Sequence, residues 1–480
     1  MRQSLNLASF PCPGHDVAMR SSRLTALVVA CALFMQNLDS TVISTALPAM
    51  ARSFGADPVR MNVALTSYLL SLAVLVPASG WVADRFGTRA VFRAAIGLFT
   101  VASVLCGRAT SLEFLVAARV LQGAGGAMML PVGRLLLLRS VPRSELVAAM
   151  AWLTVPALLG PVVGPPLGGF LVTYASWRWV FDINVPIGVL GVVLVSLFIP
   201  DTREAETYPL DARGLVLSGV AMASLMGGLE TAGRGVVPGV ATAALVGGGA
   251  LAAAGYWAHA RSRAHPLLDL SLLGVATFRV SVVSGSLFRV GVGAVPFLLP
   301  LMLQLGFGES ALQSGLVTFA SAAGALAMKP VAGPALRRFG FRATLGWNGV
   351  ASALLLGAMG LFRPGWPAAA LYAVLLAGGF ARSLQFTAYN AVAYADIPPS
   401  RMSAATTLYS TIQQLSLTLG VSAGAGALEL ARVLGARAQP VTADFSAALL
   451  AVAAVSLAAA PLAFGLAADA GAEMSGRVAR

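Results

Sequence analysis

The sequence predicts an all-α polytopic membrane protein with fourteen transmembrane helices, and three observations support this prediction. The 480 residues are 58% hydrophobic but only 11% charged, whereas about 25% of the residues in an average soluble domain are charged. The apolar residues fall into fourteen runs, each long enough to cross a bilayer as a helix of roughly 20 residues. A ten-residue pattern also occurs twice, each time at the end of such a run. Together these observations indicate a duplicated helical bundle that lies in lipid.

The apolar runs form two groups of six, with two further runs between them. The runs of the first group cover residues 24–48, 62–83, 91–108, 112–138, 146–172 and 179–199. The runs of the second group cover residues 278–304, 311–332, 343–362, 367–392, 403–430 and 444–468. The two runs between the groups cover residues 213–231 and 236–258. The sequence therefore predicts an N-terminal tail, a six-helix bundle, a linker with two inserted helices, a second six-helix bundle and a C-terminal tail, over residues 1–23, 24–199, 200–277, 278–468 and 469–480.

Basic residues are concentrated on one side of the predicted bundle. They precede the first run and follow the second, fourth, eighth and tenth runs, at Arg20, Arg23, Arg85, Arg89, Arg93, Arg139, Arg143, Arg261, Arg263, Arg337, Arg338 and Arg342. Because lysine and arginine gather in cytoplasmic loops, we expect this side and both termini to lie in the cytoplasm. A net charge of +13 is also typical of nucleic-acid-binding proteins. Short clusters of arginine between apolar runs favour membrane loops instead, with no nucleic-acid partner.

The repeated pattern begins at Gly80 and again at Gly333. Its first copy reads Gly-Trp-Val-Ala-Asp-Arg-Phe-Gly-Thr-Arg and its second reads Gly-Pro-Ala-Leu-Arg-Arg-Phe-Gly-Phe-Arg. Parallel repeats place both copies on one face of the membrane, and the eight predicted crossings between them satisfy this condition. In the first copy we expect a tight turn at Gly87 and close helix packing at Gly80. We also expect Asp84 to pair with a basic residue across the half-domain as a gate; the alternative is a solvated loop that only sets topology.

Two charged residues lie deep within predicted helices. Asp39 falls in the first run and Arg119 in the fourth, and at about 1.5 Å per residue both sit roughly 10–14 Å below the outer helix ends. Because a charge in hydrocarbon is costly, we expect the two side chains to meet in the interior, directly or through water. The pattern favours a proton site, in which protonation of Asp39 loosens its attraction to Arg119. The alternative is a structural ion pair that holds two helices together.

The fifth run is unusually rich in glycine and proline. Proline removes a backbone donor and kinks a helix, while glycine allows close packing. We expect this run to act as a hinge or as a sealed seam between the halves, the alternative being ordinary helix packing. The residues concerned are Gly160, Pro161, Gly164, Pro165, Gly168 and Gly169.

Taken together, four segments resemble the signature motifs of the major facilitator superfamily: Asp39–Pro48, Gly80–Arg89, Arg119–Ala127 and Gly160–Gly169. The block Ser176–Gly188 looks like the stretch that leads into the sixth helix of the fourteen-helix drug:proton antiporter branch, and the chain resembles bacterial multidrug-resistance exporters of that branch. The resemblance implies the major facilitator fold, with two six-helix bundles and two inserted helices. It implies that Arg119 takes part in proton coupling with Asp39 and that Gly160–Gly169 is the antiporter motif. It also implies a cytoplasmic gate motif at Gly80, Asp84, Arg85, Gly87 and Arg89.

The chain departs from the pattern of this family at several positions. Arg337 stands in the second loop copy where the first copy has Asp84, which makes the gate asymmetric. Asp182 is an additional acid, and we expect it to pair with Arg178 one helical turn earlier. Candidate cavity residues are Gln122, Asn184, Arg289 and Arg382, of which the two arginines would favour an anionic or neutral cargo.

The resemblance and the residues together predict a secondary transporter that exports a small molecule in exchange for protons by alternating access. Alternatives within transport are a symporter and an uncoupled facilitator. An enzyme would need a cluster of catalytic side chains near one face, and the sequence has none; a sensor or scaffold is a further alternative. We expect no cofactor and no metal, a lipid bilayer around the chain, a monomer, and a location in the bacterial inner membrane. The sequence does not fix the substrate.

Overall fold

The computed structural model describes residues 13–55, 61–142, 145–153, 155–199, 208–232, 239–309, 311–437 and 439–475. The regular secondary structure within these ranges is helical, and no strand occurs in them. Eleven of the described helices are long and apolar enough to cross a membrane, and a bent pair of helices adds a twelfth. The all-α membrane fold predicted from the sequence is therefore confirmed, and the structure is consistent with fourteen crossings.

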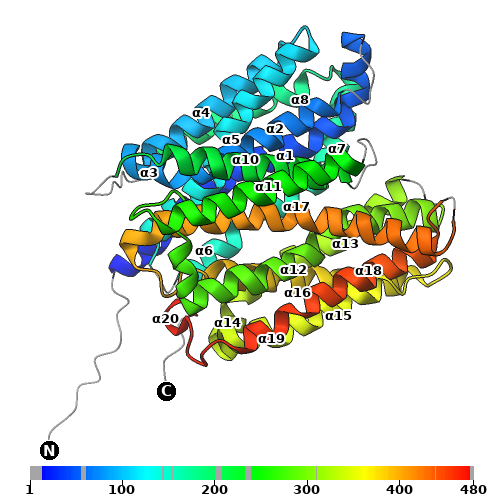
Figure 1. Ribbon diagram of the computed structural model, residues 1–480. Coiled ribbons are helices and arrows are strands. Elements are labelled where there is room, and N and C mark those ends of the chain that lie inside the picture. Colours follow the sequence, from blue (N-terminus) through cyan, green and yellow to red (C-terminus); the bar gives the residue numbers. More distant parts are fainter. Residues whose placement is uncertain are drawn as a thin grey trace, which may run out of the picture.

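The first six predicted runs form the upper group, most of whose helices lie in the upper part of Figure 1, while α6 lies lower in the view, next to α12. Several of these runs consist of two consecutive helices, because proline or a short break divides them. In chain order the helices are α1 (Pro13–Phe54), α2 (Asn62–Leu75), η1 (Val76–Ala78), α3 (Ser79–Phe86), α4 (Thr88–Gly107), α5 (Leu112–Ser140), α6 (Leu146–Leu153), α7 (Val155–Tyr174), α8 (Trp179–Asp182) and α9 (Asn184–Phe198).

The remaining runs correspond to two helices at the centre of Figure 1 and to the group below them. The two central helices are α10 (Ala212–Ala232) and α11 (Gly239–Arg261), followed by η3 (Leu270–Gly274). The lower group contains α12 (Ala276–Leu301), η4 (Met302–Gly306), α13 (Ala311–Ala327), α14 (Lys329–Ala343), η5 (Thr344–Asn348), α15 (Gly349–Met359), α16 (Ala368–Val392), η6 (Pro399–Arg401), α17 (Met402–Leu434), α18 (Thr442–Leu457), α19 (Ala459–Phe464) and α20 (Ala472–Ser475).

The two copies of the ten-residue pattern form the same kind of turn. Gly87 and Gly340 occupy equivalent positions in the copies, and their φ angles are 87° and 73°. Only glycine adopts this left-handed region at little cost. The same backbone conformation therefore explains why both copies have glycine at this position. Both turns lie at the end of the bundle that holds α3, α14 and α20 (Figure 1), which we call the α20 end.

The helices pack in pairs within each group. α4 packs on α5 and α1 packs on α7 in the upper group, while α12 packs on α17 and α13 on α16 in the lower group. The groups meet where α3 and α5 contact α17, where α6 contacts α14 and α16, and where α7 contacts α13. α10 packs against α2 and α17, so it bridges the groups from outside, and α11 packs on α10. These inserted helices therefore cover the seam without interrupting either group.

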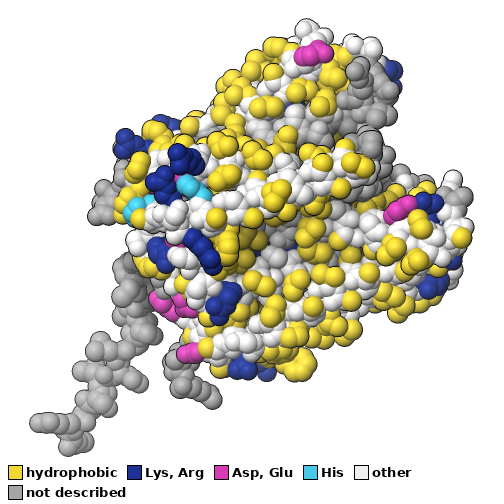
Figure 2. Space-filling model, in the orientation of Figure 1, with side chains coloured by type: hydrophobic (Ala, Val, Ile, Leu, Met, Phe, Trp, Pro, Cys, Tyr) yellow, Lys and Arg dark blue, Asp and Glu magenta, His cyan; other side chains and the backbone are white. Residues whose placement is uncertain are grey.

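The surface has the character of a protein that lies in lipid. Hydrophobic side chains cover much of the flank of the molecule in Figure 2, and arginine and lysine side chains gather mostly toward the α20 end. Val240 is 83% exposed and Leu251 is 76% exposed, both on the inserted helices. A soluble monomer rarely exposes contiguous apolar surface of this extent, so the chain is an integral membrane protein.

Candidate functional site

Asp39 of α1 and Arg119 of α5 form a direct ion pair in the interior of the upper group. Arg119 Nη1 lies 2.7 Å from Asp39 Oδ2, and both side chains are 0% exposed. The two helices contact each other and run in opposite directions, which brings residues at similar depth together. The contact expected from the depths of the two residues is therefore present.

Two amides extend this pair into a buried polar network. Gln122 Nε2 donates to Asp39 Oδ1 at 3.0 Å and Asn184 Nδ2 donates to the same oxygen at 2.9 Å. Both amides also donate to Ser103 Oγ, at 3.1 and 2.8 Å. The helices α1, α4, α5 and α9 each contribute one or more of these side chains. A change at Asp39 therefore alters hydrogen bonds that connect four helices.

The local sequence of α5 explains how the network is built. Arg119 and Gln122 are three residues apart, so they share one face of the helix. On the next turn Gly123 lets α2 approach closely, because a Cβ there would lie 2.7 Å from the Tyr68 carbonyl oxygen. This close approach lets Arg119 Nε donate to the Ala64 carbonyl oxygen at 3.0 Å. It also places the guanidinium 4.2 Å from the centre of the Tyr68 ring.

The network has unused hydrogen-bonding capacity. Among the described residues, Arg119 Nη2 and Asn184 Oδ1 have no hydrogen-bond partner although both atoms are buried. With Asp39 ionised and Arg119 protonated, the pair carries no net charge. A proton on Asp39 would leave one uncompensated positive charge in the interior, and isolating a charge from water is expensive. The arrangement can therefore couple protonation to a change in packing.

The gate motif lies at the α20 end, but its ion pair stays within the upper group. Asp84 Oδ1 lies 3.0 Å from Arg139 Nη2 of α5, so it does not connect the two groups. The contact between groups comes from Gly80 instead, where a Cβ would lie 2.4 Å from Thr407 Oγ1 of α17. Beside it, Ser79 Oγ and Thr407 Oγ1 are 3.3 Å apart. The expected ion pair of Asp84 with a basic residue is present, but it lies within the upper group and does not join the two groups.

Arg85 and Arg89 flank the turn at Gly87 in different ways. Arg85 is exposed at the end of α3. Arg89 Nη2 donates to the Ser196 carbonyl oxygen near the end of α9. The second arginine therefore holds two helices of the upper group together at the α20 end.

The glycine-rich run forms the contact between α7 and α1 beside Asp39. A Cβ on Gly160 would lie 2.8 Å from Asn37 Cβ, and a Cβ on Gly164 would lie 2.1 Å from Thr41 Oγ1. Thr41 Oγ1 also donates to the Gly160 carbonyl oxygen at 3.0 Å.

These contacts lie within the upper group, whereas α7 meets the lower group at α13. They therefore show close helix packing and do not test a hinge or a seam between the halves. α7 runs as one helix from Val155 to Tyr174, so Pro161 and Pro165 do not interrupt it. Gly168 is buried, and nothing lies within 4 Å of a Cβ placed on Gly169.

The additional acid Asp182 does not pair with Arg178. Its Oδ2 lies 3.3 Å from Arg108 Nη1, at the end of α4. Arg178 instead places its guanidinium 4.3 Å from the centre of the Trp177 ring and donates to the Ala109 carbonyl oxygen at 3.1 Å. The prediction from helical spacing was wrong although the Asp182 amide donates to the Arg178 carbonyl oxygen at 3.2 Å, because the two side chains find other partners: Asp182 pairs with Arg108, and Arg178 contacts Trp177 and Ala109.

The candidate cavity residues separate into three places. Gln122 and Asn184 belong to the Asp39 network. Arg382 of α16 donates to Ser321 and to the Gly378 carbonyl oxygen, within the lower group. Arg289 of α12 is buried and donates to the Tyr409 hydroxyl of α17. The structure therefore does not bring the four residues together in one cavity.

Sequence reasoning missed Arg134, a buried residue of α5. Arg134 Nη1 lies 3.3 Å from both the Tyr394 hydroxyl and Ser410 Oγ, and Nη2 donates to Gln413 Oε1 at 3.1 Å. All three partners belong to the lower group. The signal was available, since an arginine between Gly133 and Leu135 in an apolar run is unexpected, but the sequence does not tell which helix it faces.

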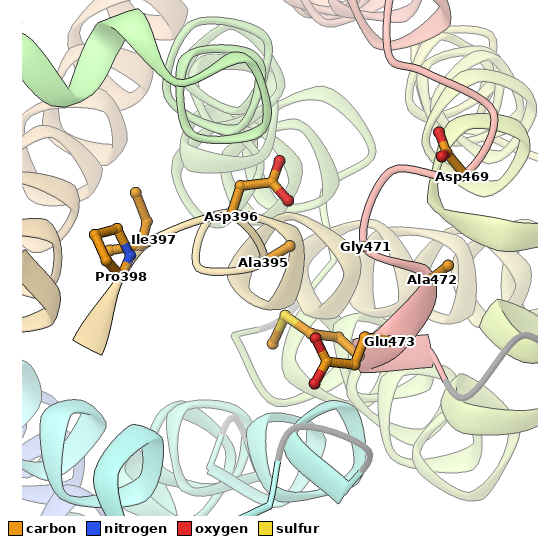
Figure 3. A pocket seen from close by; sticks show the side chains of 9 residues that line it. Ala395, Asp396, Ile397, Pro398, Asp469, Gly471, Ala472 and Glu473 are labelled. Atoms are coloured by element: carbon orange, nitrogen blue, oxygen red, sulfur yellow. The ribbon is translucent and has the colours of Figure 1, made fainter. Parts of the chain in front are cut away.

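The pocket shown in Figure 3 lies away from these residues, at the α20 end. Its volume is about 370 Å³, and its walls come from the segment after α16 and from the segment that leads into α20. Asp396, Asp469 and Glu473 line it, and Thr277 Oγ1 donates to Asp396 at 2.8 Å. It contains none of the site residues predicted from the sequence.

The chain resembles curated bacterial proteins over most of its length. It is 42% identical over 400 residues to a Serratia proteamaculans protein named "Putative multidrug resistance protein MdtD", covering 82% of this chain and 83% of the relative. It is 41% identical over 409 residues to a Yersinia enterocolitica protein of the same name, covering 84% and 86%.

Solved structures share the fold at low identity. The human organic anion transporter MFSD10 aligns with a TM-score of 0.66 at 16% identity, over 92% of this chain and 99% of that chain. The proton:xylose symporter XylE aligns with a TM-score of 0.64 at 16% identity, over 92% and 95%. The family model described as Major Facilitator Superfamily matches residues 29–421 and 282–475. The chain belongs to the major facilitator superfamily.

Proposed function

We propose that this secondary transporter exports small molecules across the bacterial inner membrane in exchange for protons. The observation that carries the proposal is the sealed ion pair of Asp39 and Arg119, held by Gln122, Asn184 and Ser103. Ionisable side chains inside a membrane protein mark ion pathways more often than they serve stability. The names of the curated relatives support drugs as one class of cargo.

The proposal assigns the chain to two six-helix bundles, over residues 24–199 and 278–468, with the linker 200–277 between them. Arginine clusters at the α20 end support a cytoplasmic location for that end and for both termini. The chain acts as a monomer in lipid, because each six-helix bundle finds its partner bundle within the same chain.

The contacts between the bundles support a transport cycle. In the described conformation these contacts include α3 and α5 against α17 and α6 against α14 and α16, at the α20 end. We assign this conformation to a state that is closed toward the cytoplasm. A proton that reaches Asp39 from the opposite side removes its charge, leaves Arg119 unpaired and favours rearrangement of the helices that hold it. Opening toward the cytoplasm then releases the proton and admits cargo.

Two motifs support these movements. Gly80 allows α3 to pack closely on α17, so it acts in the cytoplasmic gate, while Asp84 and Arg139 stiffen the upper bundle behind it. Gly160 and Gly164 keep α7 against the part of α1 that carries Asp39. This close packing excludes water from the network on that side.

The first experiment is a drug-susceptibility screen of a bacterial strain that overproduces the protein. We expect protection against one or more compounds, with protection lost in Asp39→Asn at equal protein level. Asp182→Asn is the matched control, because that carboxylate pairs with Arg108 outside the network and its loss leaves protection intact. Full protection by Asp39→Asn would contradict the proposed proton site.

The second experiment determines the direction of coupling. Everted vesicles are loaded with a dye that reports the concentration of the transported compound. A pH gradient is then imposed with the acidic side inside the vesicles. An antiporter uses this gradient to take up the compound. Collapse of the gradient with nigericin should stop uptake. Uptake that needs the opposite gradient would indicate a symporter, and uptake without any gradient would indicate a facilitator.

A further inference from the structure

Two buried arginines from different bundles face one aromatic ring at the seam between the bundles. The guanidinium carbon of Arg134 lies 5.1 Å from the centre of the Tyr409 ring, and that of Arg289 lies 4.8 Å from it. The two side chains are 2% and 1% exposed. Their guanidinium carbons are therefore at most about 10 Å apart.

Neither arginine has a carboxylate partner among the residues that the structure describes. The ion pairs found there involve other bases, such as Arg119 with Asp39 and Arg139 with Asp84. The Nε atoms of Arg134 and Arg289 are buried and have no hydrogen-bond partner in the described part of the chain. The contacts that remain are to neutral groups: Tyr394, Ser410 and Gln413 for Arg134, and Tyr409 for Arg289.

Physical chemistry makes this arrangement unusual. A buried charge is normally paired or neutralised, because its removal from water is costly. Neighbouring aromatic rings offset part of that cost, but two cations near one ring also repel each other. The seam therefore carries a positive potential with free donors of fixed geometry. A guanidinium fork matches the two oxygens of a carboxylate, sulfonate or phosphate group.

We propose that Arg134 and Arg289 form an anion-binding site, and that it receives the acidic group of the transported small molecule. The proposal rests on the proposed transport function and adds a cargo class to it. Arg134 belongs to the N-terminal bundle and Arg289 to the C-terminal bundle, so opening of the seam separates α5 from α17 and admits water and anions. In the closed state both guanidiniums contact the Tyr409 ring, which takes the place of the anion.

Charge-selective labelling of an introduced cysteine tests the site without knowledge of the cargo. Ser410→Cys places a thiol beside Arg134 in a variant whose three cysteines are replaced by alanine. The protein is reconstituted in phosphatidylcholine vesicles and treated with an anionic sulfonatoethyl or a cationic trimethylammonium-ethyl methanethiosulfonate. Ser262→Cys, on the exposed linker, gives the reference ratio of the two rates.

We expect the ratio of anionic to cationic labelling at Ser410→Cys to exceed the reference by about tenfold or more, as a positive cleft concentrates anions. The excess should largely disappear in Arg289→Gln and in Arg134→Gln. The excess should persist in Arg363→Gln. This change removes a positive charge from the C-terminal bundle, but the hydrogen bonds of Arg363 go to Gly360, Phe362 and Ser446. A ratio at or below the reference, or no reaction with either reagent, would overturn the proposal.

Two further measurements in the same labelling experiment identify the source of the anion. Salicylate should slow the anionic labelling, whereas salicylamide, which has nearly the same shape without the charge, should not. Protection that appears only when phosphatidylglycerol is present would assign the site to lipid and overturn its role in cargo binding.

Transport by the same variants separates this inference from the proposed function. Arg289→Gln should lose protection against acidic compounds while it retains any protection against cationic ones. Export confined to cationic compounds would overturn the cargo class and leave the transporter intact. A wild-type chain that moves no compound would instead refute the proposed function, whatever the labelling shows.

Discussion

Asp39 accepts hydrogen bonds from three side chains, and each donor is neutral or cationic. Arg119 supplies charge, while Gln122 and Asn184 supply fixed dipoles that are themselves anchored on Ser103. The amides thus hold the carboxylate in one orientation and contribute to the energy needed to protonate it. Hydrogen bonds to a charged group contribute about 1.5–3 kcal/mol each. Each amide should therefore influence the pH dependence of transport separately.

Removal of one amide should therefore move the pH profile of transport. In Asn184→Leu the carboxylate loses a donor that holds it in the network, so the dependence of transport on pH should change. Transport against pH in everted vesicles measures the shift. Asn348→Leu, which removes an amide that bonds to Ala381 and Gln385 in the other bundle, should leave the profile in place; a profile unmoved by Asn184→Leu would separate the amide from proton coupling.

At the scale of elements, the packing of α7 on α1 has almost no free space. Gly160 and Gly164 face Asn37 and Thr41, which lie on either side of Asp39 in the sequence. This contact explains why small residues recur at four-residue spacing in α7. It also means that the orientation of α1 near Asp39 depends on the small size of its neighbours on α7.

Gly164→Ala should destabilise the protein and reduce transport. The added methyl group would lie 2.1 Å from Thr41 Oγ1, and overpacking of this kind costs about 1–3 kcal/mol. Thr41→Ala in the same chain removes the nearer clashing atom but leaves the Thr41 Cβ at 2.8 Å, so it should recover part of the thermal stability, measured by tryptophan fluorescence in detergent. Gly169→Ala is the control, because nothing lies within 4 Å of its Cβ. Equal stability of Gly164→Ala and Gly169→Ala would refute the close contact.

Asp211 anchors the inserted helices at the start of α10. It accepts hydrogen bonds from the Gly214 and Leu267 amides, at 3.0 and 3.4 Å, and contacts His259 Nε2 at 2.8 Å. Burial raises the pKa of Asp211, but the Gly214 amide, His259 and the Leu267 amide outweigh burial, so its pKa lies below the ordinary value. One carboxylate therefore joins α10, α11 and the linker that follows.

The stabilisation by Asp211 should depend on pH. Because the folded-state pKa is lowered, the contribution is complete above the unfolded-state pKa of about 3.9 and is lost as the pH falls through the folded-state value. Asp211→Ala should therefore lower the free energy of unfolding by about 1 kcal/mol near neutral pH, the usual loss for a helix cap, and the difference from wild type should narrow in acid. Thermal unfolding across a pH series tests this, with the exposed Asp469→Ala as control. A difference that is constant with pH would exclude the ionised carboxylate as its cause.

The elements themselves were largely predictable, and their contacts were not. Hydropathy locates helices well because lipid selects long apolar runs, and Gly87 and Gly340 marked their turns by repetition. The pairing of Asp39 with Arg119 followed from depth alone. The partners of Asp84 and Asp182 did not, because Arg139 and Arg108 become neighbours only through the packing of α3, α5 and α8. For the same reason nothing in the sequence showed that Arg134 faces the other bundle.

At the scale of the whole molecule, the described conformation is held together at the α20 end. Gly80 and Ser79 meet Thr407 there, and Arg134 reaches Tyr394, Ser410 and Gln413 across the same seam. Alternating access requires these contacts to break in every cycle. A covalent link at this place should therefore stop transport without damage to either bundle.

Ser79→Cys with Thr407→Cys provides such a link. The two side-chain oxygens are 3.3 Å apart, close enough for a disulfide to form with little movement of the backbone. Oxidation should reduce transport to background and reduction should restore it, while each single-cysteine variant should be insensitive to both treatments. Full activity of the cross-linked chain would show that the seam does not open during transport.

The most direct test of proton coupling is the release of protons when cargo binds. A compound identified in the susceptibility screen is added to purified protein in weakly buffered solution, and the pH is recorded with binding measured in parallel. We expect wild type to release protons on binding and Asp39→Asn to bind the compound with no release. Proton release by Asp39→Asn equal to that of wild type would contradict the account, because the proton would then come from another group.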